Sequence, residues 1–159
     1  MDGRSAPAER PAAIDWRTDH RLWVELFVAF NFAALVGDIY LAHSENSFRR
    51  ASEFIPVYFS AGAAAALLAG IVLEARWGFT AAWRDVGYIV GWVSVAVGLA
   101  GVVLHLDSSF FYERTIRSLT YAAPFAAPLA FAGLGLLLIV NRMVSVRTLE
   151  WAQGGERRR

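Results

Sequence analysis

Hydrophobic residues in this chain gather into four long blocks that are separated by short polar stretches. The blocks cover residues 22–43, 54–73, 86–106 and 119–140, and the second block contains no charged residue. A helix that crosses the hydrocarbon core of a bilayer needs about 20 mostly apolar residues. Only a helix can satisfy its backbone polar groups within one such segment. The pattern therefore predicts four membrane-spanning helices.

The connections between the blocks are short, which favours antiparallel packing of consecutive helices. We therefore predict an all-α fold, an integral membrane four-helix bundle, over residues 21–144. A polar, flexible tail of residues 1–20 precedes it, and an arginine-rich tail of residues 145–159 follows. Both tails are expected on the cytoplasmic side.

The distribution of arginine predicts this orientation. Eleven arginines lie beside the ends of the blocks that face the two tails, and four lie on the other side. Because cytoplasmic loops are enriched in positive charge, both termini are expected inside the cell. All 15 basic residues are arginine, which suggests GC-rich coding, and we expect a bacterial cytoplasmic (inner) membrane. The eleven are Arg4, Arg10, Arg17, Arg21, Arg76, Arg84, Arg142, Arg147, Arg157, Arg158 and Arg159.

Composition excludes several classes of protein. The chain is 57% hydrophobic and 18% charged, against about 45–50% and 25% for soluble domains, so an ordinary cytosolic enzyme is excluded. It has no cysteine, which rules out disulfides, CxxC redox pairs and c-type haem attachment. The net charge of +1 gives no basic surface for nucleic acid. The expected surroundings are the lipid bilayer.

Small residues recur at helical spacing in two of the blocks. Gly62, Ala66 and Gly70 lie in the second block, and Gly87 and Gly91 lie in the third. Small side chains allow helix backbones to approach closely in lipid. The pattern predicts either tight packing inside the bundle or self-assembly through one of these faces.

One short motif occurs twice. Residues 43–48 (HSENSF) and 105–110 (HLDSSF) both read His-x-acid-Asn/Ser-Ser-Phe, at the ends of the first and third blocks. Both blocks run in the same direction, so the two hairpins are candidates for parallel repeats about an axis normal to the membrane.

The repeat places two histidines at the extracytoplasmic face together with several carboxylates. His43 and His105 are the candidate ligands, and imidazole suits Zn, Cu, Fe and Ni. Either a divalent transition metal or a b-type haem held axially would fit them. Plain polar helix ends in water, or a pH-sensing or proton-handling pair, are the alternatives. The candidate carboxylates are Glu45, Glu53, Asp107 and Glu113.

The first block also carries two polar residues within its apolar run. Asn31 and Asp38 are seven residues apart, so they lie on one face of a helix. Intramembrane carboxylates usually face the bundle interior and mark an ion path. The alternative is structural: Asn31 bonds across helices, and the hydroxyl of Tyr58, Tyr121 or Ser60 caps Asp38.

A further acidic residue lies near the start of the first block. Glu25 follows Arg21 by four residues, so an interfacial ion pair accounts for it.

No motif for nucleophilic catalysis or phosphate binding is present, and no catalytic residue is predicted. We expect a non-enzymatic accessory or assembly component, either a homo-oligomer or a subunit of a larger membrane complex, with metal or haem at its outer face. The alternatives are a small proton- or cation-coupled transporter acting through Asp38 and a membrane-embedded metalloenzyme that uses the His/carboxylate cluster.

Overall fold

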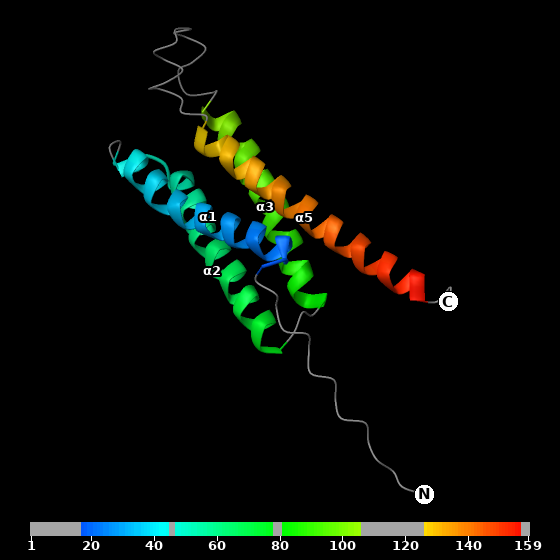
Figure 1. The fold of residues 1–159 in the computed structure, drawn as a ribbon. Helices are drawn as coiled ribbons and strands as arrows, with labels where there is room; N and C mark the ends of the chain where they lie inside the picture. Colours follow the sequence, from blue (N-terminus) through cyan, green and yellow to red (C-terminus); the bar gives the residue numbers. More distant parts are fainter. Residues whose placement is uncertain (1–16, 45–46, 78–80, 106–125, 157–159) are drawn as a thin grey trace, which may run out of the picture.

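The computed structural model describes residues 17–44, 47–77, 81–105 and 126–156, with only the backbone described at 81–84 and 145–156. Four long helices dominate it (Figure 1): α1 (His20–Ser44), α2 (Phe54–Trp77), α3 (Ala81–His105) and α5 (Ala126–Glu156). A short 3-10 helix, η1 (Ala51–Glu53), leads into α2. The described segments contain no strand, and the predicted all-α fold is confirmed.

Each long helix has a stretch that is long and apolar enough to cross a membrane. The shortest stretch, Ala126–Val144, has 19 residues and measures about 28 Å at a rise of 1.5 Å per residue. Large apolar side chains also cover the outside of the bundle, and Phe30 is 76% exposed. Such a surface would promote aggregation in water, whereas lipid solvates it.

The helices extend further than the apolar blocks predicted. α2 and α3 run into polar residues, so that only residues 78–80 lie between them. Of the fourth block, predicted over residues 119–140, the structure describes residues 126–140, and α5 runs from Ala126 to Glu156. Hydropathy marks only the lipid-compatible part of a helix, while each added residue still gains a backbone hydrogen bond.

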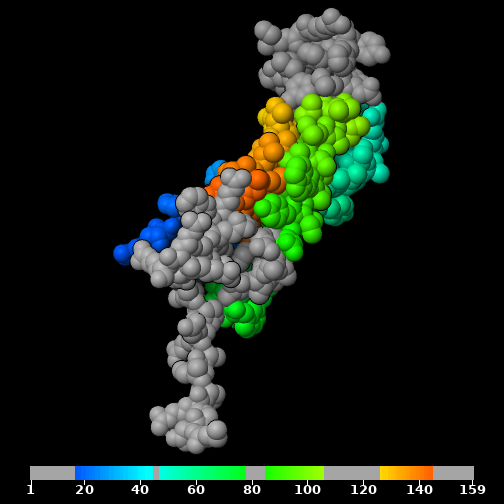
Figure 2. Space-filling view, turned by 90° about the vertical axis from the view of Figure 1, so that its right-hand side faces the viewer, coloured from blue at the N-terminus to red at the C-terminus, as the bar shows by residue number. Residues whose placement is uncertain are grey.

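The four helices form two closely packed antiparallel pairs. α3 packs most extensively against α5, and α1 packs against α2. The two pairs meet mainly through α1 and α5 and to a lesser extent through α2 and α3. α1 and α3 therefore occupy diagonal corners of the bundle. The face in Figure 2 is formed largely by α3, with α5 alongside.

Small residues bring the α3 and α5 backbones together. A Cβ added at Gly98 would lie 2.6 Å from the Pro128 carbonyl oxygen, and one at Gly135 would lie 2.5 Å from the Gly91 oxygen. On α3 the contact positions follow a spacing of four and three residues, which keeps one face of a helix against its partner. These positions are Gly87, Gly91, Ser94, Gly98 and Gly101, and the partners on α5 are Pro128, Phe131, Ala132, Gly135, Ile139 and Arg142.

The two stripes of small residues noted in the sequence differ in outcome. Gly87 and Gly91 are points of close helix approach, as the packing interpretation predicted. Gly62 on α2 instead faces outward, with nothing within 4 Å of an added Cβ. Tight packing inside one copy is therefore wrong for Gly62, and self-assembly through that face stays a prediction.

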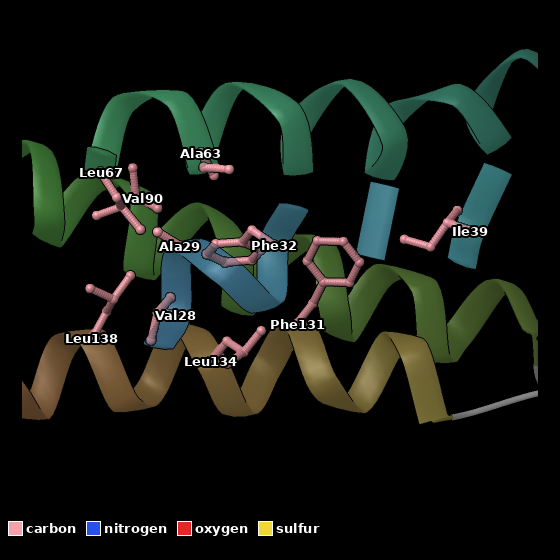
Figure 3. Packing of buried hydrophobic residues seen from close by; sticks show 11 residues of the cluster. Val28, Ala29, Phe32, Ile39, Ala63, Leu67, Val90, Phe131, Leu134 and Leu138 are labelled. Atoms are coloured by element: carbon pink, nitrogen blue, oxygen red, sulfur yellow. The ribbon is translucent and has the colours of Figure 1, made fainter. Parts of the chain in front are cut away.

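An aromatic cluster joins the two helix pairs in the middle of the bundle. Phe32 of α1, Phe59 of α2 and Phe131 of α5 have ring centroids 5.8–5.9 Å apart. Figure 3 shows Phe32 and Phe131 side by side between the helices. Their edge-to-face and tilted contacts add directional attraction to packing. We call these three residues the phenylalanine cluster.

Candidate functional site

The histidine end of the bundle, where α1 and α3 finish, brings together the two histidines singled out in the sequence. The ring centroids of His43 and His105 are 6.4 Å apart, and the ring planes are nearly perpendicular at 87°. The residues come from diagonal helices that belong to different pairs. The two predicted ligand residues therefore form a side-chain contact between the two helix pairs.

Both imidazoles are oriented in the same way by their own helices. Nδ1 of His43 lies 2.9 Å from the Ile39 carbonyl oxygen, and Nδ1 of His105 lies 2.7 Å from the Gly101 carbonyl oxygen. A carbonyl oxygen can only accept, so Nδ1 carries the hydrogen and donates it. In the neutral imidazole the lone pair then lies on Nε2. Metal-binding histidines are commonly fixed by this backbone hydrogen bond.

A tight turn after α1 places an aromatic ring against His43. Ser47 and Phe48 have φ values of 57° and 46°, in the left-handed region that non-glycine residues rarely adopt. The Ser47 N–H donates to the Ser44 oxygen and the Phe48 N–H to the His43 oxygen, which terminates the helix in the manner of a Schellman motif. The Phe48 ring lies 6.1 Å from the His43 ring at 21° and stacks on Phe54 at 4.3 Å.

The turn provides a reason for part of the repeated motif. Serine and phenylalanine at its last two positions close the helix and return an aromatic ring to the histidine. The second copy of the motif continues from His105 into residues 106–110, which lie outside the described part.

The spacing of the two rings suits coordination by a shared metal. With metal–nitrogen bonds of about 2.0–2.1 Å, two imidazoles on opposite sides of one metal have centroids roughly 6.3 Å apart, and two at a tetrahedral angle roughly 5.2 Å. The observed 6.4 Å between the two centroids is compatible with two imidazoles that bind one metal.

The carboxylates of the predicted ligand set contribute less to the described geometry. Among the described residues, no three His, Asp or Glu side chains form a group that could hold a metal ion. Glu53 lies in η1 at the histidine end with its Oε2 buried. Glu45, Asp107 and Glu113 lie outside the described residues.

The two polar residues within the α1 span, Asn31 and Asp38, lie on its partly exposed and exposed sides. The Asn31 side-chain amide donates to the Phe27 carbonyl oxygen of its own helix at 2.8 Å. Asp38, which we expected to face the interior, lies on the exposed side of α1. The Ser60 hydroxyl, a proposed cap for Asp38, instead donates to the Pro56 oxygen of its own helix at 2.7 Å. Tyr58 is exposed, and Tyr121 lies outside the described residues.

The opposite end of the bundle, which we call the charged end, contains an ion-pair network that spans three helices. Glu25 of α1 lies 3.6 Å from Arg21 Nη1 and 3.0 Å from Arg142 Nη2 of α5. Arg21 also pairs with Glu74 of α2. Glu25 and Arg142 are only 2% and 4% exposed. The ion-pair network is defined as Arg21, Glu25, Glu74 and Arg142.

The network is balanced in charge and in contact with all four helices. The two arginines balance the two glutamates, which lowers the cost of removing each charge from water, and the more exposed Asp19, 3.8 Å from Arg21 Nη2, adds a negative charge at the edge of the network. A Cβ added at Gly87 of α3 would lie 2.5 Å from Arg142 Nε, so the guanidinium rests on the α3 backbone. Asn141 of α5 donates to the Arg21 carbonyl oxygen at 3.2 Å.

Sequence reasoning identified only one ion pair of this network. Arg21 and Glu25 were identified by their four-residue spacing. Arg142 was counted only among the arginines that predict the orientation, and Glu74 was not singled out; their partners lie 117 and 53 residues away in the chain. One signal was present: arginine or glutamate stands at or just beyond the boundary of three apolar blocks at the same predicted end.

Comparisons with known proteins add no relative to this picture. No protein-family model, curated protein or solved structure matches the chain. Function is therefore inferred from the geometry of the histidine end and the charged end of the bundle.

Proposed function

We propose that this chain is a membrane protein that holds a transition metal between His43 and His105, either as an ion or as the iron of a b-type haem. The observation that carries the proposal is the meeting of the two rings at 6.4 Å, each with its Nδ1 at a backbone carbonyl. Two histidines exposed to water as plain helix ends would gain little from being turned toward one another across the bundle diagonal.

The two forms of the metal differ in the ligands that they require. A haem supplies four nitrogens, so two axial imidazoles complete the coordination of its iron. A zinc or copper ion takes further protein ligands, and the carboxylates next to the histidines in the repeated motif, Glu45 and Asp107, are the candidates. The proposal thus separates into two arms that carboxylate variants distinguish.

In the cell we assign the protein an accessory role in a larger membrane assembly or homo-oligomer. The described chain has most of its mass within the apolar bundle and short connections such as residues 78–80. A transport path through Asp38 would have to form between copies, because that side chain lies on the outside of α1.

The test uses full-length protein purified in detergent, first as isolated and then after titration with haemin, Cu²⁺ or Zn²⁺. Absorption spectra and elemental analysis report what binds. His43→Ala and His105→Ala should each lose the bound group. His20→Ala is the matched control, since His20 is an exposed histidine at the other end of α1.

The outcomes discriminate between the two arms. A Soret band that both histidine variants abolish, and that Glu45→Gln and Asp107→Asn leave unchanged, supports haem. Stoichiometric metal without a Soret band, weakened in the carboxylate variants as well, supports an ion. Wild-type protein that binds none of the three probes, or histidine variants that bind as well as wild type, would refute the proposal.

A further inference from the structure

The two helix pairs are joined at three levels along the bundle. At the charged end Arg142 of α5 pairs with Glu25 of α1. The phenylalanine cluster joins them in the middle. At the histidine end His43 contacts His105. Since each pair packs closely within itself, these contacts decide how one pair is placed against the other.

The phenylalanine cluster holds the two pairs together at one level in the middle of the bundle, so we treat it as the pivot about which one pair tilts against the other. Along α1, Glu25 lies about 10 Å from Phe32 and His43 about 16 Å from it on the other side, at 1.5 Å per residue. A displacement of about 1 Å at the charged end then becomes about 1.6 Å at the histidines.

A shared metal tolerates much less movement than that. Ligand distances in metal sites hold to about 0.2 Å. His43 and His105 come from diagonal helices, so their relative position depends on contacts made through other helices. The polar contacts that can set the tilt lie farthest from the histidines, at Arg142 and at the neighbouring Asn141, which donates to the Arg21 oxygen.

We propose that Arg142 is a positioning residue for the His43–His105 pair. Its guanidinium lies between the Glu25 carboxylate of α1 and the α3 backbone at Gly87, so it contacts both of the helices that carry the histidines. The ion-pair network thereby fixes the geometry of a site at the opposite end of the bundle. The positioning role of Arg142 at a metal site rests on the proposed function, whereas the effect of Arg142 on helix geometry can be measured without any metal.

The principal variant removes the ion pair between α1 and α5 and leaves the net charge of the chain unchanged. Glu25→Gln combined with Arg142→Gln neutralises one acid and one base, while Arg21 and Glu74 keep their pairing. A second variant, Gly87→Ala, keeps every charge and displaces the guanidinium, since the new Cβ would clash with Arg142 Nε. Arg76→Gln is the control, an exposed arginine at the same end.

The absence of cysteine makes the geometry directly measurable. Spin labels at Leu41→Cys on α1 and Val103→Cys on α3 stand on residues that are 66% and 64% exposed at the histidine end, and they report the distance between the helix pairs. Labels at Val103→Cys and Leu129→Cys report a distance within the α3/α5 pair. Pulsed electron–electron double resonance gives the distribution of each distance between the two spin labels, and circular dichroism checks that the helices persist.

We expect the distance distribution between the pairs to broaden or shift by about 1–2 Å in the double variant and in Gly87→Ala, with the distance within the α3/α5 pair unchanged. Affinity for the probe that binds wild type should fall about 10- to 100-fold, as for other residues that orient ligands. Unchanged distributions in both variants would overturn the inference. Altered distributions in a protein whose wild type binds neither haemin nor metal would support the role of Arg142 in helix placement and refute the proposed function alone.

Discussion

At the scale of single residues, two buried serines allow a hydrogen bond between helices to be compared with one inside a helix. The Ser94 hydroxyl of α3 donates to the Phe131 oxygen of α5, whereas the Ser60 hydroxyl donates to Pro56 within α2, both at 2.7 Å. A chain unfolded in a membrane keeps its helices, so only the bond of Ser94 is lost on unfolding.

We therefore predict that Ser94→Ala lowers the free energy of unfolding by about 0.5–1.5 kcal/mol and that Ser60→Ala changes it by less than about half that amount. Unfolding in mixed micelles with increasing dodecyl sulfate, followed by circular dichroism or by fluorescence of the native tryptophans, measures both. Equal losses in the two variants would show that the bond between the helices adds nothing of its own.

At the scale of helices, the α3/α5 contact depends on glycines that leave no room for a methyl group. At Gly98 an added Cβ would meet backbone atoms of α5 at 2.6 Å, and backbone cannot move aside without separating the helices. At Gly133 of α5 nothing lies within 4 Å.

We predict that Gly98→Ala destabilises the bundle by about 1–3 kcal/mol, the usual cost of overpacking. Gly133→Ala should be neutral or stabilising by up to about 1 kcal/mol, because alanine is the better helix former. The same micelle titration gives both values. A Gly98→Ala protein as stable as wild type would mean that α3 and α5 are not in close contact.

The helices were predictable from the sequence to a greater degree than their contacts. Each apolar block exceeds the length of a bilayer span, and that local signal located four helices. It could not show that Gly91 packs inward and Gly62 outward, because both stand in helices that are apolar on every side. The pairing of His43 with His105 was predictable because the motif occurs twice. The link from Glu25 to Arg142 depends on how distant helices meet, which no local pattern encodes.

At the scale of the whole molecule, the arginine distribution predicts which way the bundle faces. Positively charged flanks remain in the cytoplasm, so the charged end should lie inside and the histidine end outside. Ser47→Cys at the histidine end and Arg76→Cys at the charged end are both exposed and introduce single thiols into a cysteine-free chain. A membrane-impermeant maleimide applied to intact spheroplasts should label the first variant and reach the second only after permeabilisation. The reverse pattern would mean that the bundle faces the other way.

The ion-pair network joins three helices, so substitutions in it should change the stability of the whole bundle. Arg142→Gln alone leaves the buried network with one excess negative charge, since Glu25 and Glu74 then share Arg21. Breaking a buried pair from one side costs about 3–5 kcal/mol, and the remaining arginine places the expected loss near about 3 kcal/mol. Glu25→Gln alone should cost a similar amount, because it removes the carboxylate that lies 3.0 Å from the buried Arg142 guanidinium.

The double variant should be far more stable than the two single losses added together, within about 1–2 kcal/mol of wild type. Charge balance is restored in it, and the remaining pair of Arg21 with Glu74 still ties α1 to α2. A double-mutant cycle from micelle titrations measures this coupling, which these values place at about 4–5 kcal/mol, above the range of about 0.5–3 kcal/mol that is usual for residues in direct contact. Additive losses would indicate that Glu25 and Arg142 act independently, and α5 would then be held against α1 by apolar packing and by the hydrogen bond from Asn141 to the Arg21 oxygen. A strong coupling would show that the charged end resists separation of the two helix pairs, as the placement of the histidines at the other end requires.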